Sequence, residues 1–391
     1  MFSTDDEESE LSTLLKKYLP EDYVPVPEGG LTSSEKFWCK HYQYLQDHGY
    51  QLRPRYAPGW VHSWKDTDKF YLDCEDGACL RRSHVIDAIH IPTGSAVAIK
   101  QLSKEIGPDE EAIMRYFSSE PLASHPHNHC IPLLDAFPVP DDDAEQFLVV
   151  PLLHSFDSPV FDTFGEAVEC IRQLFEGLQF LHKHNVAHRD LNANNFMMET
   201  NSMYPKGYHP QEPLYEPDMI GFAKPFTRTQ CPQKYFIIDY GHARQYDLND
   251  PNPRDTKKYG GDISVPEYEN DRGGTHDPFA TDVYYVGNLV RTHFIEGHPL
   301  LPSVRGYDGF EFLLPLIDDM TQADPRRRPR IDEAVERMDQ IIAGLSEWKL
   351  RSRTSSRSTN IFETVSHIFW HWARKIAFIY NGTPALPRPS H

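Results

Sequence analysis

Apolar residues recur at helical spacing along several stretches of the chain. The clearest is Phe164–His182, where they fall at i, i+3, i+4 and i+7, the pattern of one buried helix face. The same periodicity over shorter stretches predicts four further helices. They span Asp109–Ser118, Asp282–Ile295, Phe310–Asp319 and Ile331–Leu345. Since four of the five follow residue 150, we expect that part of the chain to be mainly helical.

Strand-like patterns dominate before residue 150. His84–His90 and Ala96–Leu102, joined by the turn Pro92-Thr93-Gly94, predict a β-hairpin. Ile131–Phe137 and Gln146–Leu153 predict two more strands on either side of the acidic turn Asp141–Asp143. We therefore expect an α+β, bilobal fold with a small, mostly β N-terminal lobe and a larger helical C-terminal lobe.

The flanking segments differ in composition from these two lobes. Residues 1–36 are acidic and are expected to be largely disordered, apart from a short helix at Leu11–Leu19. The aromatic-rich extension 37–70 is expected to pack on the domain that follows. The full predicted division is 1–36, 37–70, an N-lobe at 71–150, a C-lobe at 151–345 and a basic amphipathic tail at 346–391.

Composition narrows the expected location and partners. The formal net charge of -19 argues against nucleic acid, whose phosphates require a basic face. The acidic N-terminus does not resemble a signal peptide, and no apolar run approaches the length of a membrane-spanning helix. Six scattered cysteines suggest neither a disulfide framework nor a zinc site. We expect a cytoplasmic protein, with the nucleus as an alternative.

Three short motifs indicate phosphoryl-transfer chemistry. Val97-Ala98-Ile99-Lys100 comes first, His188-Arg189-Asp190-Leu191 with Asn195 follows, and Asp239-Tyr240-Gly241 comes last. In a loose phosphoryl-transfer transition state the protein mainly clamps charge and aligns the acceptor. Each motif alone is compatible with an ordinary solvated lysine, loop or turn. All three in this order favour the catalytic interpretation.

With these motifs the chain resembles the eukaryotic protein kinase superfamily over roughly Tyr71 to Leu345. The six-residue step from His182 to His188, the triplet Val265-Pro266-Glu267, and Arg328 as its ion-pair partner agree with that family. So does Asp282, which resembles the aspartate that holds the catalytic loop.

The resemblance implies ATP and Mg²⁺ as cofactors and assigns the site. Asp190 would orient the acceptor hydroxyl, Asn195 and Asp239 would hold magnesium, and Lys100 would contact phosphate while paired with Glu110 rather than Glu111. The expected adenine pocket has a ceiling, a gatekeeper, a hinge and a floor. Val85 and Ala98 would form the ceiling, and Val150 would be the gatekeeper. Pro151 to Leu153 would form the hinge, and Met197 the floor.

Several departures from the family are visible. Its glycine-rich phosphate lid is replaced in this register by Ala78, Leu80 and Ser83, and the lysine expected after the catalytic aspartate is Asn192. The threonine that normally touches that lysine corresponds to Gly260.

Two length differences accompany these substitutions. The insertion Met203–Gln233 is expected to lie across the second lobe. The stretch from Asp282 to Arg328 is shorter than usual for the family. Together with the segments Arg53-Pro54-Arg55-Tyr56 and Pro58-Gly59-Trp60, these length differences make the chain similar to divergent fungal protein-kinase-like families.

The leading functional expectation is a protein kinase that phosphorylates serine or threonine in a protein substrate. A pseudokinase that binds nucleotide or protein, and a small-molecule kinase, are the alternatives. Arg189 is expected to need an anion, supplied by phosphorylated Thr256 or by Asp255 or Asp262. The tail helix 361–380 is expected either to cover a groove of its own lobe or to bind a membrane surface or partner helix.

Overall fold

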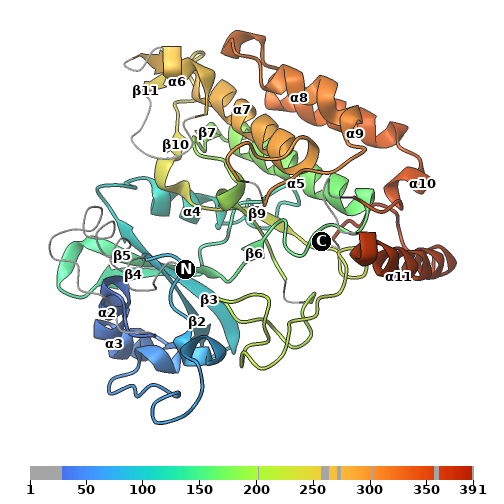
Figure 1. Cartoon of the computed structure of the whole chain (residues 1–391). Coiled ribbons are helices and arrows are strands. Elements are labelled where there is room, and N and C mark those ends of the chain that lie inside the picture. The colour runs from blue at the N-terminus through green and yellow to red at the C-terminus, as the bar shows by residue number, and fades with distance from the viewer. Residues whose placement is uncertain are drawn as a thin grey trace, which may run out of the picture.

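The computed structural model describes residues 29–200, 202–256, 264–270, 274–301, 303–355 and 361–389. Side chains at 269–270 and 361–370 lie outside that description. The predicted helix at Leu11–Leu19, Gly260 and Asp262 fall outside the described residues. Figure 1 shows a curved sheet with short helices on one side of the molecule and a bundle of longer helices on the other.

The N-lobe is built on an antiparallel five-stranded sheet of order β1-β2-β3-β5-β4. Its strands are β1 (Tyr50–Leu52), β2 (Val85–His90), β3 (Ser95–Ser103), β4 (Asp135–Val139) and β5 (Asp142–Pro151). The predicted strand at Ile131–Phe137 begins only at Asp135. The stretch before it is held instead by backbone contacts of Cys130 and Ile131 with Ile237 of the C-lobe.

Two short helices, α2 (Ser33–Lys40) and α3 (Tyr42–Asp47), cover one face of this sheet. Alternate strand residues such as Ile86, Ile99 and Phe147 form a buried cluster with Trp38 and Leu45 of the two helices. Burying a side chain of this size stabilises the fold by about 1.5–3 kcal/mol. The aromatic residues of the N-terminal segment are therefore core residues of the N-lobe.

The N-terminal segment is more ordered than the sequence pattern predicted. Disorder was expected up to residue 36, but α2 begins at Ser33, where Thr32 and Glu35 form a reciprocal capping box. The sheet also crosses the expected domain boundary at residue 70, since β1 pairs with β2 through Tyr50–His90 and Leu52–Ala88. The domain boundaries themselves stay predictions.

A buried ion pair fastens the start of this segment to the residues after β1. The guanidinium of Arg55 donates to both carboxylate oxygens of Glu35 at 2.8 and 3.0 Å, and both side chains are fully buried. Arg55 also donates to the carbonyl oxygens of Gly29, Gly30 and Asp76. Every nitrogen of this guanidinium group therefore donates at least one hydrogen bond within the protein.

The C-lobe consists mainly of helices, as its periodicity predicted. They are α5 (Phe164–Lys183), α6 (Pro266–Asn270), α7 (Pro278–Val290), α8 (Leu314–Met320), α9 (Ile331–Gly344) and α10 (Glu347–Leu350). Helix α5 is buried along most of its length and contacts both α7 and α9. The helix predicted at Asp282–Ile295 starts at Pro278 and changes to a wider π-turn at Arg291–Ile295.

Short strands lie in the connections before and between these helices. Three of them, β6 (His154–Ser155), β8 (Phe196–Met198) and β9 (Tyr235–Ile237), form one small sheet. Two pairs complete the set: β7 (Val186–Ala187) with β10 (Arg244–Gln245), and β11 (Asp255–Thr256) with β12 (Thr275–His276).

The insertion between β8 and β9 does not lie on the second lobe alone. Its Arg228 and Thr229 are buried against the C-lobe, where Arg228 donates to the carbonyl oxygen of Phe156. Its middle part reaches the N-lobe, where Gln211 donates to Asp87 at 2.7 Å and Glu212 pairs with Arg81 at 2.9 Å. The insertion therefore bridges the two lobes.

The tail forms helix α11 (Ile361–Tyr380), which lies beside α10 and the start of α5. Arg374 contacts Asp162 just before α5, so one face of the helix is docked on its own lobe. The opposite face leaves Trp372, Ile376 and Ile379 about half exposed or more. Among the described residues, no helix is long and apolar enough to span a membrane.

Replacing Arg55 by Met should lower the free energy of unfolding by about 3–5 kcal/mol, because Glu35 would stay buried without its cationic partner. Urea unfolding would measure the change. Arg81→Met is a matched control, since it breaks an exposed pair with Glu212 and should cost only about 0–1 kcal/mol. Equal effects of the two substitutions would contradict the anchoring role of the buried pair.

Candidate active site

The catalytic-loop residues lie between β7 and β8 and are fixed by one buried carboxylate. Asp282 on α7 accepts hydrogen bonds from the backbone amides of His188 and Arg189 at 2.7 and 2.6 Å. The imidazole Nε2 of His182, at the end of α5, lies 3.0 Å from the same carboxylate. The loop is thereby held to two helices of the C-lobe core.

The side chain of Asp190 is oriented by two neighbouring amides. The Nδ2 atoms of Asn192 and Asn195 donate to its two carboxylate oxygens at 3.1 and 2.9 Å. Arg189, directly before it, has a φ of 67°, a left-handed conformation that is uncommon outside glycine and often occurs at functional sites. Asn192, where a lysine was expected, contacts the same carboxylate without adding a charge.

Three charged groups from different elements meet at Lys100. Its Nζ atom on β3 lies 2.6 Å from Glu110 Oε1 and 2.8 Å from Asp239 Oδ1. Glu110 belongs to α4 (Glu110–Phe117), whereas Glu111 points elsewhere and pairs with Arg115. Lys100 therefore joins the sheet, the N-lobe helix and the start of the Asp239-Tyr240-Gly241 segment.

The two carboxylates respond differently to sharing one ammonium group. Burial is the largest influence on Glu110 and raises its pKa, although Lys100 acts in the opposite direction. Burial alone would also raise the pKa of Asp239, but the charge and hydrogen bond of Lys100 outweigh it and lower the pKa to about 2. Asp239 is therefore ionised at neutral pH and is available as a ligand for a cation.

Asn195 and Asp239 lie on adjoining segments, because the backbone amide of Ile238, directly before Asp239, donates to the carbonyl oxygen of Asn195 at 2.9 Å. The amide nitrogen of Asn195 faces Asp190, and its Oδ1 accepts no hydrogen bond within the described chain. Asp239 supplies carboxylate oxygens on a side chain that is 40% exposed. Amide and carboxylate oxygens are ligands that Mg²⁺ accepts, so Asn195 and Asp239 fit the predicted metal site.

The expected adenine-pocket residues also lie along the junction of the lobes. Val85 lies opposite Lys100 in the β2–β3 pair, so these two side chains share one face of the sheet, and Ala98 follows on that face. Ala98 in turn lies opposite Val150, and Pro151 opposite Val97, at the end of β5.

Two residues of the C-lobe side complete this predicted pocket. Leu153 is buried just after β5, and Met197 is partly buried on β8, where it pairs with Ser155. The proposed roles of all these residues in nucleotide binding stay predictions.

The segment before β2 differs from the tight hairpin loop of the sequence register. Because β1 lies at Tyr50–Leu52, the connection to β2 spans residues 53–84 and contains three short 3-10 helices. Ala78, Leu80 and Ser83 belong to this long connection. Strand β1 has only three residues, too few for an alternating pattern, so the sequence did not reveal this long connection.

Two basic residues at the end of this connection were missed by sequence reasoning. His84 lies beside β3, where its carbonyl oxygen accepts a hydrogen bond from the backbone amide of Gln101 at 2.9 Å. Burial lowers the pKa of His84 and the charge of Lys100 lowers it further, while Asp239 acts in the opposite direction. Arg82 donates to Asn194 Oδ1 of the catalytic loop at 3.5 Å. The sequence signal that could have identified Arg82 and His84 was their position just before Val85.

The anion expected beside Arg189 is a carboxylate of the chain. Asp255 Oδ2 lies 3.1 Å from Arg189 Nη1 and 3.1 Å from Arg244 Nη1, and it accepts a hydrogen bond from the Tyr246 hydroxyl at 2.8 Å. Burial raises the pKa of Asp255, but these donors together hold it below its usual value. Arg189 also donates to the backbone carbonyl of Thr256 at 2.7 Å.

A second ion pair closes the same segment. Arg328 Nη2 lies 2.6 Å from Glu267 Oε2, and both side chains are buried. Thr281 on α7 donates to Glu267 as well. This is the ion pair that the resemblance predicted between the Val265-Pro266-Glu267 triplet and Arg328.

A family model described as "Protein kinase domain" matches residues 81–361. The chain belongs to this family and has its bilobal α+β fold. The matched region begins after β1 and after most of the long connection to β2.

Curated relatives match over shorter regions. The Dictyostelium discoideum protein named "Probable myosin light chain kinase" is 30% identical over 125 residues, covering 29% of this chain and 30% of the relative. The liver/testis isoform of the phosphorylase b kinase gamma catalytic chain from Bos taurus is 26% identical over 158 residues, covering 35% and 37%. The chain thus spans about a third of the length of these relatives.

Solved structures with detectable likeness include the Rad53 kinase domain with SCD2, alone and in complex with AMPPNP. The complex is 15% identical, covers 66% of this chain and 86% of that chain, and has a TM-score of 0.40. The structure without AMPPNP is 16% identical, covers 70% and 88%, and has a TM-score of 0.42. Likeness at this level supports no conclusion about function.

Asp239→Asn should flatten the acid side of the stability curve. Because the pKa of Asp239 is lowered from 3.8 to about 2, its ionised form stabilises the fold above about pH 4, and this contribution is lost as the pH falls toward 2. The partial exposure of the side chain reduces the effect to on the order of 1 kcal/mol. Urea unfolding at pH values from about 5 to 3 would measure it.

The exposed Asp318→Asn serves as the control for this titration and should follow the wild-type curve. If Asp239→Asn and wild type lose stability equally on acidification, Lys100 does not hold Asp239 in the way the structure indicates.

Proposed function

We propose that this protein transfers the γ-phosphoryl group of Mg-ATP to a hydroxyl group of a protein substrate, serine or threonine. The observation that carries the proposal is the convergence of Lys100, Glu110 and Asp239, together with the oriented carboxylate of Asp190. The two groups are linked because His188 of the Asp190 loop contacts the carbonyl oxygen of Ile238, directly before Asp239, at 3.0 Å. These groups supply a phosphate contact, a metal ligand and an acceptor-orienting group in one place. Membership of the protein kinase family supports the same activity.

In this proposal each residue has a separate task. Asp190, held by Asn192 and Asn195, would orient the acceptor hydroxyl and receive its proton. Asn195 and Asp239 would hold Mg²⁺, which neutralises charge on the transferring phosphoryl group. Lys100 would contact the phosphates, with Glu110 fixing its position.

The long connection before β2 suggests how phosphate is covered without a glycine-rich loop. His84, near Lys100 and Asp239, and Arg82, near Asn194, would offer side-chain donors in place of backbone amides. The ordinary side chains of this segment also motivate the second candidate, a pseudokinase that binds nucleotide or protein without transferring phosphate.

The partner is proposed to be a protein. The net charge of -19 favours basic over acidic surfaces. The exposed Trp372, Ile376 and Ile379 of α11 support an additional contact of the tail with a partner helix or membrane surface. The six unpaired cysteines support a reducing compartment, the cytoplasm or the nucleus.

Asp190→Asn should reduce phosphoryl transfer by roughly 100- to 10,000-fold and leave the affinity for ATP nearly unchanged, because it removes the proton acceptor and no nucleotide contact. Transfer of radiolabelled phosphate to a peptide library, with calorimetry for ATP binding, would measure both. The control Asp318→Asn replaces an exposed carboxylate on α8 and should keep the wild-type rate.

The same assays separate the alternatives. Magnesium-dependent ATP binding by the wild type with transfer no higher than that of Asp190→Asn would establish the pseudokinase. Absence of ATP binding as well would leave the site with a structural role only.

Phosphatase treatment should leave the activity unchanged, because Asp255 already supplies the anion beside Arg189. Asp255→Asn should lower the rate about tenfold or more, since Arg189 and Arg244 lose a charge-assisted partner. Thr256→Ala should stay within about twofold of wild type, because Arg189 contacts only the backbone carbonyl of that residue. A loss after phosphatase that phosphorylation of Thr256 restores would reverse this assignment.

A further inference from the structure

The insertion Met203–Gln233 contacts the N-lobe sheet beside the predicted adenine pocket. Asp87 lies opposite Ala98 in the β2–β3 pair, so its side chain leaves the sheet on the face that carries the predicted ceiling residues Val85 and Ala98. Gln211 of the insertion donates to Asp87 Oδ1 at 2.7 Å, and both side chains are buried. Figure 1 shows the insertion as yellow-green loops beside β2 and β3.

Two tyrosines of the insertion contact the other side of the predicted pocket, next to the hinge. The ring centres of Tyr204 and Tyr208 lie 5.6 and 4.8 Å from that of His154. His154 is buried and directly follows Leu153, the last residue of the predicted hinge. The insertion therefore runs from the hinge end of the predicted pocket to its ceiling.

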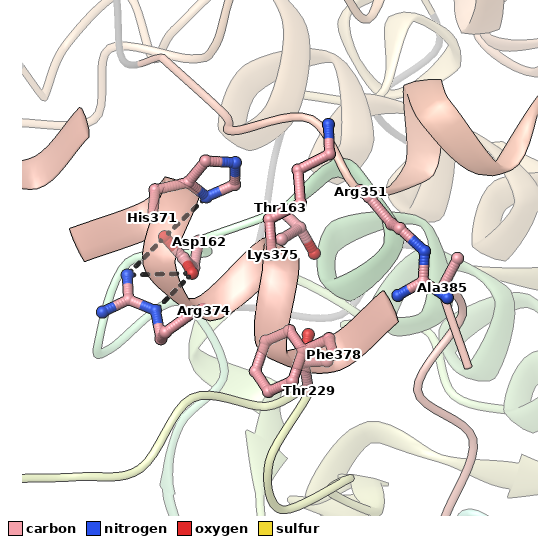
Figure 2. Close-up of a pocket in the computed structure, with 9 residues that line it drawn as sticks. All are labelled: Asp162, Thr163, Thr229, Arg351, His371, Arg374, Lys375, Phe378 and Ala385. Atoms are coloured by element: carbon pink, nitrogen blue, oxygen red, sulfur yellow. Dashed lines mark hydrogen bonds and ion pairs between the residues drawn. The ribbon is translucent and has the colours of Figure 1, made fainter. Parts of the chain in front are cut away.

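The base of the insertion is fixed to the C-lobe. The backbone amide of Phe226 donates to the carbonyl oxygen of Met203 at 2.8 Å, which joins the two ends of the insertion. The amide and the hydroxyl group of Thr229 both donate to Glu166 on α5 at 2.8 Å. Figure 2 shows Thr229 at the start of α5, where it lines the same small space as Thr163. Movement between the lobes must therefore be taken up where the middle of the insertion contacts the N-lobe.

Side-chain hydrogen bonds hold this middle part to the N-lobe. Gln211 uses both ends of its amide, because Nε2 donates to Asp87 and Oε1 accepts from the backbone amide of Arg81 at 3.0 Å. Nearby, Nε2 of the buried His209 lies 3.4 Å from Glu75 Oε1. Polar contacts of this kind can be exchanged for hydrogen bonds with water, so they can open without unfolding of either lobe.

We propose that the insertion closes the outer edge of the nucleotide pocket, and that nucleotide enters and leaves only when Gln211 separates from Asp87. The inference rests on the proposed binding of Mg-ATP between the lobes. With the base of the insertion held by the C-lobe and its middle by the N-lobe, the lobes cannot move apart at this edge while the contact is closed. Opening of the contact therefore limits the rates of nucleotide association and dissociation alike.

Gln211→Ala should raise the association and dissociation rate constants of an ATP analogue about tenfold or more, because it removes a buried hydrogen bond to a carboxylate. The dissociation constant should change much less, since both rates rise together. Stopped-flow fluorescence with magnesium and N-methylanthraniloyl-ATP would measure both rates. Asp87 keeps Arg53 as a partner at 3.3 Å, so the variant should fold. If it does not, Gln211→Glu opens the contact by charge repulsion.

Lys206→Met is the matched control. Its ammonium group pairs with Glu216 at 2.9 Å, so the substitution breaks an exposed ion pair within the insertion itself. Both rate constants should stay within about twofold of wild type.

Hydrogen exchange without nucleotide tests the contact itself. The backbone amide of Arg81 donates to Gln211 Oε1, so it should exchange at least about tenfold faster in Gln211→Ala than in wild type. Lys206→Met should exchange at the wild-type rate. Equal exchange of this amide in all three proteins contradicts a closed contact in solution.

The nucleotide measurements separate failure of the closure from failure of the proposed function. Nucleotide binding with equal rates in wild type and Gln211→Ala overturns the closure and leaves the proposed function intact. Binding only by Gln211→Ala supports an insertion that is closed in the wild type. Binding by neither protein overturns the proposed function and the closure with it.

Discussion

The contact of Lys100 with two carboxylates is the interaction on which the arrangement of the two lobes depends. Glu110 comes from the N-lobe helix and Asp239 from the C-lobe, and both reach the same ammonium group within 2.8 Å. Glu110 is buried and depends on Lys100 for compensation of its charge, whereas Asp239 is partly exposed and adds a second, weaker contact. The position of α4, the start of the Asp239-Tyr240-Gly241 segment and the face of β3 are therefore set together.

Features of the fold that extend over many residues, or that depend on residue type, could be predicted from the sequence. Helix α5 has enough turns to display its periodicity, and the motifs around Lys100, Asp190 and Asp239 carry chemistry that depends on residue type. The helical spacing also favoured Glu110 over Glu111 as the partner of Lys100, because Glu110, Ile113 and Met114 share one buried face of the helix.

Features that depend on few residues or on distant contacts could not be predicted. Strand β1 has only three residues, which is too short for an alternating pattern to be recognised. The Thr32 to Glu35 capping box was a local signal, but its significance depends on Arg55, twenty residues further on. The insertion reaches the N-lobe through single polar side chains such as Gln211, and its partner Asp87 is remote in sequence.

Because residues 50–52 supply a strand, the unit that covers its own sheet edge and apolar sheet face is larger than the matched family domain. A fragment starting at residue 81 would leave β2 as an outer strand with unpaired backbone amides and carbonyls. It would also uncover the apolar sheet face around Ile99 and Phe147. Such a fragment would tend to self-associate along that edge, so the residues preceding the family domain protect this protein against aggregation.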